Sequence, residues 1–168
     1  MFTWIDGRIS CGIASVAALA GVSYAQAKRA ANRLGIFADD PRLWSETRPV
    51  RELMTRFRVH AATSETPFVS WAALPDVALL AIKWHREKGQ PFWHWVVFVR
   101  EGERACVLDP KAALRHHVRT DFGRMHPKWF ITVSGLPGRK AGRETGHETG
   151  RAAGRSSGGT VGKAMGRA

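Results

Sequence analysis

The chain has 168 residues and a formal net charge of +12, from 26 Lys and Arg against 14 Asp and Glu. This length predicts one domain, residues 1–135, and a tail, residues 136–168. Two cysteines, Cys11 and Cys106, are too few for a disulfide scaffold and fit a reducing compartment such as the cytoplasm. No Cys/His cluster has zinc spacing, so we expect neither a metal nor a cofactor. No apolar run is long enough for a transmembrane helix, and the N-terminus lacks the pattern of a signal peptide.

Positive charge is spread over the whole chain. Residues 1–135 carry a net charge of +7 and residues 136–168 one of +5. A basic surface favours acidic partners, which include nucleic acid, anionic lipid and acidic peptides. In the tail, glycine recurs every fourth residue from Gly138 to Gly166 with few apolar residues, which predicts disorder. The tail is then either a low-complexity repeat without a specific role or a sequence-independent tether that binds nucleic acid weakly.

Hydrophobic periodicity predicts helices in the first half of the chain and strands in the second. The helices expected are residues 11–20, 24–34 and one that starts at Pro49. The strands expected are 59–61, 77–84, 92–99, 104–108 and 129–133. Between them we expect irregular chain at 64–70, a helical turn within 71–76, a polar loop at 85–90 and a short helix near Asp121. This order defines an α+β fold in which N-terminal helices pack on a C-terminal antiparallel sheet.

Cys11 stands at the first turn of a short helix of small residues. Ser10 is a suitable N-cap, whose hydroxyl accepts a backbone N–H, and Gly21 is a natural stop. The positive end of the helix dipole favours the thiolate, which is the form that a cysteine hydrolase uses as nucleophile. The alternative is a small buried cysteine that packs like alanine, which is the role we expect for Cys106 in its strand.

His94 is the one histidine of the chain inside a strongly predicted strand. Strand alternation groups it with Phe92, Val96 and Phe98, so it needs a polar partner among apolar neighbours. The next strand returns through a hairpin turn at residues 101–103 and ends at Asp109. Counted from this turn, His94 and Asp109 are near neighbours, so the carboxylate can orient the imidazole. The alternative is a buried histidine satisfied by a carboxylate without any chemistry.

These motifs resemble those of the bacteriocin-processing cysteine peptidases, a papain-like family that cleaves after double-glycine leader sequences. The resemblance rests on Ser-Cys-Gly-Ile-Ala at residues 10–14, Gly-Val-Ser-Tyr at 21–24, His-Trp-Val-Val at 94–97 and Val-Leu-Asp-Pro at 107–110. It implies a papain-like fold and a catalytic triad of Cys11 as nucleophile, His94 as base and Asp109 as the residue that orients the base. It also implies a peptide or protein substrate.

The chain departs from this family at one position. Members have a glutamine about six residues before the cysteine, which donates to the oxyanion, whereas this chain has Ile5 there. Loss of one such donor costs roughly two to three orders of magnitude in rate. Three functions therefore stay open: a stand-alone cysteine peptidase, a catalytically weakened papain-like domain that binds a peptide without turnover, and a basic protein associated with nucleic acid.

Overall fold

The computed structural model describes residues 10–137, which form three α-helices, two 3-10 helices and seven strands. The α-helices are α1 (Cys11–Ala20), α2 (Tyr24–Arg33) and α3 (Arg48–Arg56), and the 3-10 helices are η1 (Pro41–Trp44) and η2 (Phe122–Arg124). The strands are β1 (His60–Ala61), β2 (Thr66–Pro67), β3 (Val77–Glu87), β4 (Gln90–Glu101), β5 (Arg104–Leu108), β6 (Val118–Arg119) and β7 (Pro127–Gly135). Ile5 and the glycine repeat of the tail lie outside the described residues.

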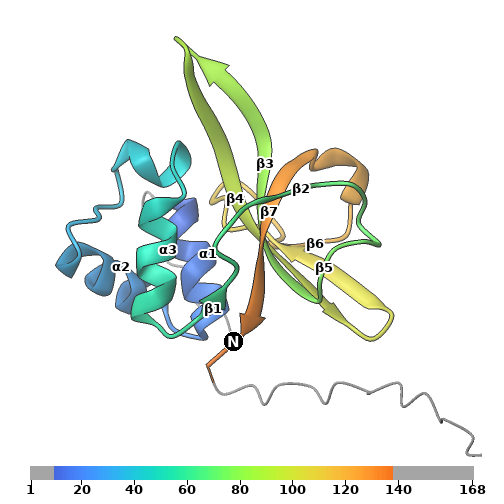
Figure 1. The fold of residues 1–168 in the computed structure, drawn as a ribbon, viewed down its shortest axis with the longest axis horizontal. Coiled ribbons are helices and arrows are strands. Elements are labelled where there is room, and N and C mark those ends of the chain that lie inside the picture. Colours follow the sequence, from blue (N-terminus) through green and yellow to red (C-terminus); the bar gives the residue numbers. More distant parts are fainter. Residues whose placement is uncertain (1–9, 138–168) are drawn as a thin grey trace, which may run out of the picture.

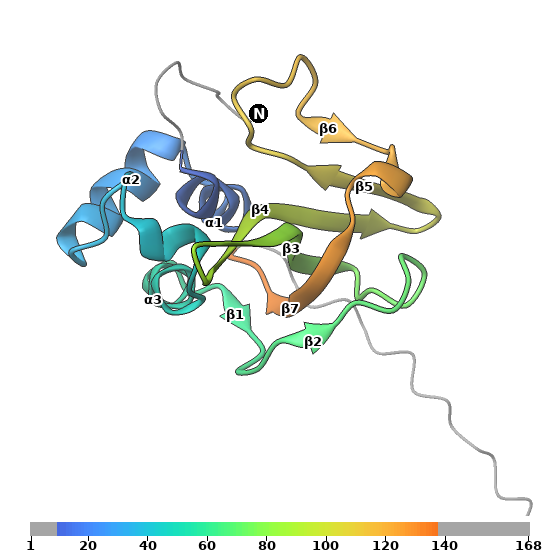
Figure 2. The ribbon, with the colours of Figure 1, turned by 90° about the horizontal axis from the view of Figure 1, so that it is seen from above.

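The strands form one antiparallel sheet in the order β1-β7-β3-β4-β5-β6, and β2 pairs with β7 beside this path. The long hairpin of β3 and β4 is its centre, and β7 and β5 flank that hairpin. All three α-helices lie on the same side of the sheet, as both views show (Figure 1, Figure 2). The expected α+β architecture, with helices packed on an antiparallel sheet, is confirmed.

Each face of the sheet has its own apolar core, because neighbouring strand residues point to opposite faces. On β4, Trp93, Trp95 and Val97 belong to the core beneath the helices, and Val96 and Phe98 belong to the core of the other face. The predicted alternation along this strand is therefore confirmed. Within residues 10–137, no helix combines the length and the apolar character needed to cross a bilayer.

The helix boundaries follow from local signals that the sequence carries. Gly21 ends α1 in the left-handed conformation, with φ of 66°. Ser23 begins α2 with a capping box, in which its hydroxyl accepts from the Gln26 N–H and the Gln26 side chain accepts from the Ser23 N–H. Pro49 stands in the first turn of α3, where its missing N–H costs nothing.

Four local expectations are wrong. Residues 71–76 form a turn with bends and contain no helical residue. Residues 64–70, expected to be irregular, contain the short strand β2. The polar residues 85–90 are not a loop, because β3 and β4 continue through them to a two-residue turn. Cys106 lies on β5 as expected, but it is half-buried and belongs to neither core.

Candidate active site

Cys11 is the first residue of α1, and its side chain is half-buried. Ser10 stands at the N-cap position, but its hydroxyl forms no cap bond and is buried without a partner, so the expected capping bond is wrong. Ser10 is held by hydrogen bonds of its backbone instead. Its N–H donates to the Tyr24 hydroxyl at 3.1 Å, and its carbonyl accepts from the Ala14 N–H at 2.9 Å. Two helices therefore fix the position of the thiol.

His94 lies on β4 opposite Ile82 of β3. On the other side of β4, strand β5 pairs only from Val97 to Glu101, so within the described chain no strand covers the edge beside His94. α1 packs against β4, and the Ser15 hydroxyl donates to the Trp95 carbonyl at 3.3 Å. This packing brings the start of α1 to the uncovered edge, where the Cys11 thiol lies near enough to the imidazole to raise the pKa of His94.

Asp109 follows the last residue of β5 and is fully buried. Continuing the β4–β5 register past the Val97–Leu108 pair places it opposite Val96, diagonal to His94 on the same face. Its Oδ1 lies 2.7 Å from His94 Nε2 and accepts the Lys111 N–H at 3.0 Å. Because Nε2 faces the carboxylate, Nδ1 is the ring nitrogen that remains for the thiol.

The second carboxylate oxygen of Asp109, Oδ2, pairs with Arg119 on β6. Arg119 Nη1 donates to Asp109 Oδ2 at 2.7 Å, and the same guanidinium donates from Nε and Nη2 to Asp121 at 2.9 and 2.7 Å. The Asp109 backbone is tied to His117, whose carbonyl accepts the Asp109 N–H at 2.8 Å. A buried carboxylate is costly unless its charge is compensated, and here a guanidinium and an imidazole both face it.

The electrostatics of the site favour an ionised pair. Burial disfavours the imidazolium, but hydrogen bonds to Asp109 and Cys11, with the attraction of both groups, outweigh it and raise the pKa of His94 to about 9. Burial likewise disfavours the Asp109 carboxylate, yet the hydrogen bond and charge of His94, followed by Arg119, lower its pKa to about 2. At neutral pH, His94 is therefore an imidazolium and Asp109 a carboxylate.

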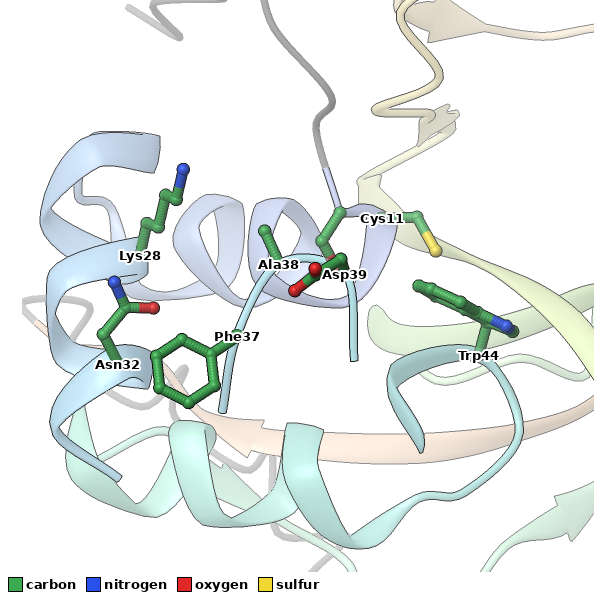
Figure 3. A pocket seen from close by; sticks show the side chains of 8 residues that line it. Cys11, Lys28, Asn32, Phe37, Ala38, Asp39 and Trp44 are labelled. Atoms are coloured by element: carbon green, nitrogen blue, oxygen red, sulfur yellow. The ribbon is translucent and has the colours of Figure 1, made fainter. Parts of the chain in front are cut away.

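A pocket of about 720 Å³ opens beside Cys11. Its walls combine aromatic, apolar and polar side chains: Lys28 and Asn32 of α2, Phe37, Ala38 and Asp39 of the following loop, and Trp44 of η1. Figure 3 shows the Trp44 indole next to the Cys11 sulfur, with Lys28 and Asn32 on the far wall. The pocket leaves space for a ligand group next to the thiol.

The structure thus brings together Cys11, His94 and Asp109, which the sequence analysis singled out. Sequence reasoning missed Arg119, since nothing in the polar stretch 111–128 distinguishes it from other basic residues. It also counted Tyr24, the chain's single tyrosine, as an apolar residue of its helix, although the Tyr24 hydroxyl accepts the N–H of Ser10, the residue before Cys11. Among residues 10–137, no group of three His, Cys, Asp or Glu side chains could hold a metal ion.

The geometry therefore describes an α+β protein in which a cysteine, a histidine and a buried aspartate are aligned between a helix and a sheet. Comparison with family models, with curated proteins and with solved structures found no match to this chain.

Proposed function

We propose that this protein is a papain-like cysteine peptidase that hydrolyses peptide bonds with Cys11, His94 and Asp109. The observation that carries the proposal is the alignment of His94 between the Cys11 thiol and a fully buried carboxylate that lies 2.7 Å from Nε2. Nucleophile, base and orienting group in this order are what acyl transfer by a thiol requires. The resemblance of the sequence motifs supports glycine-rich leader peptides as substrates, and the reduced state of a nucleophilic thiol supports a reducing compartment such as the cytoplasm.

In this proposal the resting site holds a Cys11 thiolate beside the His94 imidazolium, with the proton of the thiol residing on His94 Nδ1. The thiolate then attacks the scissile carbonyl carbon, and the imidazolium returns its proton to the leaving amine. Water, deprotonated by the now neutral His94, hydrolyses the resulting thioester, and the departing Cys11 thiolate restores the thiolate–imidazolium pair. Asp109 keeps its charge throughout, holds the ring in one orientation and stabilises the imidazolium.

The beginning of α1 supports the oxyanion of the tetrahedral intermediate. The first N–H groups of a helix have no acceptor within the helix, and the dipole adds partial positive charge at that end. Because the Ser10 hydroxyl does not cap α1, it does not compete for these donors. The Cys11 N–H is therefore the backbone donor that we assign to the oxyanion, in a chain that has Ile5 where the family glutamine would stand.

The proposal is tested by comparing the reactivity of the two cysteines and by assaying turnover. We expect iodoacetamide at neutral pH to alkylate Cys11 faster than Cys106, because the imidazolium stabilises the Cys11 thiolate while burial raises the pKa of Cys106. Cys11→Ala should abolish cleavage of a degenerate peptide library, and Cys106→Ala should leave it intact. Equal alkylation of the two cysteines, together with identical cleavage by wild type and Cys11→Ala, would contradict the proposal.

A further inference from the structure

A long hairpin rises from the part of the sheet that carries His94. Beyond the Ile82–His94 pair, β3 and β4 remain paired through His85–Phe92 to Glu87–Gln90. Lys88 and Gly89, with φ of 48° and 83°, close it in a two-residue turn of the type that fits the strand twist. Residues 83–90 are exposed, and the hairpin stands clear of the helices and of the rest of the sheet (Figure 1).

The hairpin and the strand beside it carry positive charge without compensating partners. Lys83, Arg86 and Lys88 lie on the hairpin, and Lys128 of β7 lies at its base; none of these four forms an ion pair with any residue in the range 10–137. The one acid of residues 83–90, Glu87, lies 3.1 Å from His85 Nε2. The Lys83 carbonyl and, after it, Glu87 raise the pKa of His85.

Two of these cations are placed by an aromatic ring. The Arg86 guanidinium lies 5.8 Å and the Lys128 ammonium 5.2 Å from the Trp84 ring centre. Contacts of this kind contribute about 0.5–1 kcal/mol at exposed sites, enough to favour one position for a long side chain. The charges of Arg86 and Lys128 are therefore localised beside Trp84.

This charge lies close to the triad. Arg86 is paired with Pro91, three residues along β4 from His94, which is about 10 Å of extended strand. Across the site, Lys28 lines the pocket beside Cys11, where Asp39 is the acidic side chain of the lining. The two acids that contact Arg119 are already neutralised, since Asp109 faces His94 and Arg119, and Asp121 faces Arg119.

We propose that the β3–β4 hairpin is a cationic substrate guide that selects peptides with acidic residues near the cleaved bond. The inference rests on the proposed peptidase function and names its substrate class. Unpaired cations beside a reactive site raise the local concentration of oppositely charged ligands and accelerate their binding, with a steep dependence on salt. The peptide supplies carboxylates to the hairpin cations, which have no ion-pair partner among residues 10–137.

The test uses the full chain and two labelled peptides of equal length, one with three glutamates and one with three lysines beside the same cleavable sequence from the library. At low salt we expect kcat/KM to be at least about tenfold higher for the acidic peptide. In 0.5 M NaCl the difference should fall to about twofold or less, because salt screens exposed charges. Arg86→Gln with Lys88→Gln should reduce the low-salt preference several-fold.

The matched control removes two charges elsewhere, by Arg29→Gln with Arg33→Gln on the exposed side of α2, and it should retain the preference. Fluorescence anisotropy with Cys11→Ala measures peptide binding without cleavage. If the acidic peptide binds selectively but the wild type cleaves neither peptide, the peptidase function fails while the cationic guide stands. Equal binding of both peptides, or a preference that survives the hairpin substitutions, would overturn the inference. So would a single-stranded oligonucleotide that displaces the acidic peptide at much lower concentration, which would make nucleic acid the ligand of the hairpin.

Discussion

At the scale of single residues, the site depends on one buried carboxylate with donors on both oxygens. Asp109 has His94 and the Lys111 N–H on Oδ1 and Arg119 on Oδ2, so its rotation is blocked from both sides. Its depressed pKa makes a stabilising contribution that is complete above its usual 3.8 and is lost as the pH falls through about 2. The raised pKa of His94 contributes stability below 6.5 that is lost as the pH rises through about 9.

The proposed mechanism predicts a pH dependence of peptide cleavage from the pKa of His94. Since the leaving amine needs a proton from the imidazolium, kcat/KM for a peptide should fall as the pH rises through about 9. Alkylation of Cys11 should not fall in the same range, because it requires only the thiolate. Stopped-time cleavage assays and mass-spectrometric alkylation rates between pH 6 and 10.5 measure both.

Asp109→Asn provides the matched variant for this profile. Loss of the charge that stabilises the imidazolium should move the alkaline limb down by roughly one to three pH units. A limb that stays at the same pH in Asp109→Asn would show that another group titrates there.

At the scale of elements, α1 owes its position to the missing side chain of Gly12. A Cβ built at this residue lies 3.1 Å from Leu43 Cδ2, 3.1 Å from Val50 Cγ1 and 3.3 Å from the Leu43 carbonyl oxygen. Two of these neighbours are flexible side chains, but the carbonyl is held, since it accepts the Trp95 indole N–H at 2.7 Å. With any larger residue at this position, the helix that carries Cys11 or its neighbours in η1 and α3 must therefore shift by a few tenths of an ångström.

We expect Gly12→Ala to destabilise the fold although alanine favours helices. Helix propensity gains about 1 kcal/mol, whereas overpacking a filled site costs about 1–3 kcal/mol, so the net loss should be about 1 kcal/mol. Gly12→Val should lose more and should also slow alkylation of Cys11, because the helix start must move. Urea denaturation measures the first effect. Gly123→Ala is the control, since a Cβ there meets nothing within 4 Å, and an equal loss in that variant would contradict the packing argument.

The sequence predicts the elements that carry strong local signals. It does not predict segments that are strands only because they are hydrogen-bonded to a neighbouring strand. The end of α1 follows from Gly21 and the limits of β5 from the hairpin turn, whereas the Ser10 hydroxyl, expected to cap α1, forms no cap bond. Residues 85–90 are polar on both faces, so no alternation of apolar and polar residues distinguishes a strand from a loop there. The two-residue turn that joins β3 and β4 holds the ends of these strands together. The two-residue strands β2 and β6 carry no periodic signal, which is why the partnership of Arg119 with Asp109 could not be foreseen.

At the scale of the whole molecule, the candidate triad is divided between two layers. Cys11 belongs to the helical layer, whereas His94 and Asp109 belong to the sheet. Their alignment therefore depends on the packing of the layers, where Trp93, Trp95 and Trp129 form a cluster of edge-to-face rings with centres 5.2–5.7 Å apart. The Trp95 N–H crosses the interface to the Leu43 carbonyl of η1, and the Ser15 hydroxyl crosses in the opposite direction to the Trp95 carbonyl.

Two tryptophans of this cluster allow the interface hydrogen bond to be measured against a matched control. Trp95→Phe removes a buried indole N–H bonded to Leu43, and Trp93→Phe removes one that is buried without a partner. The ring truncation is similar, but only the first change leaves a buried carbonyl unsatisfied, at a cost of about 1–3 kcal/mol. By urea denaturation, Trp95→Phe should lose that much more stability than Trp93→Phe. Because Trp95→Phe would also release η1 from β4, this substitution should slow alkylation of Cys11. Equal losses of stability and equal alkylation rates in the two variants would mean that packing alone sets the distance between the helices and the sheet.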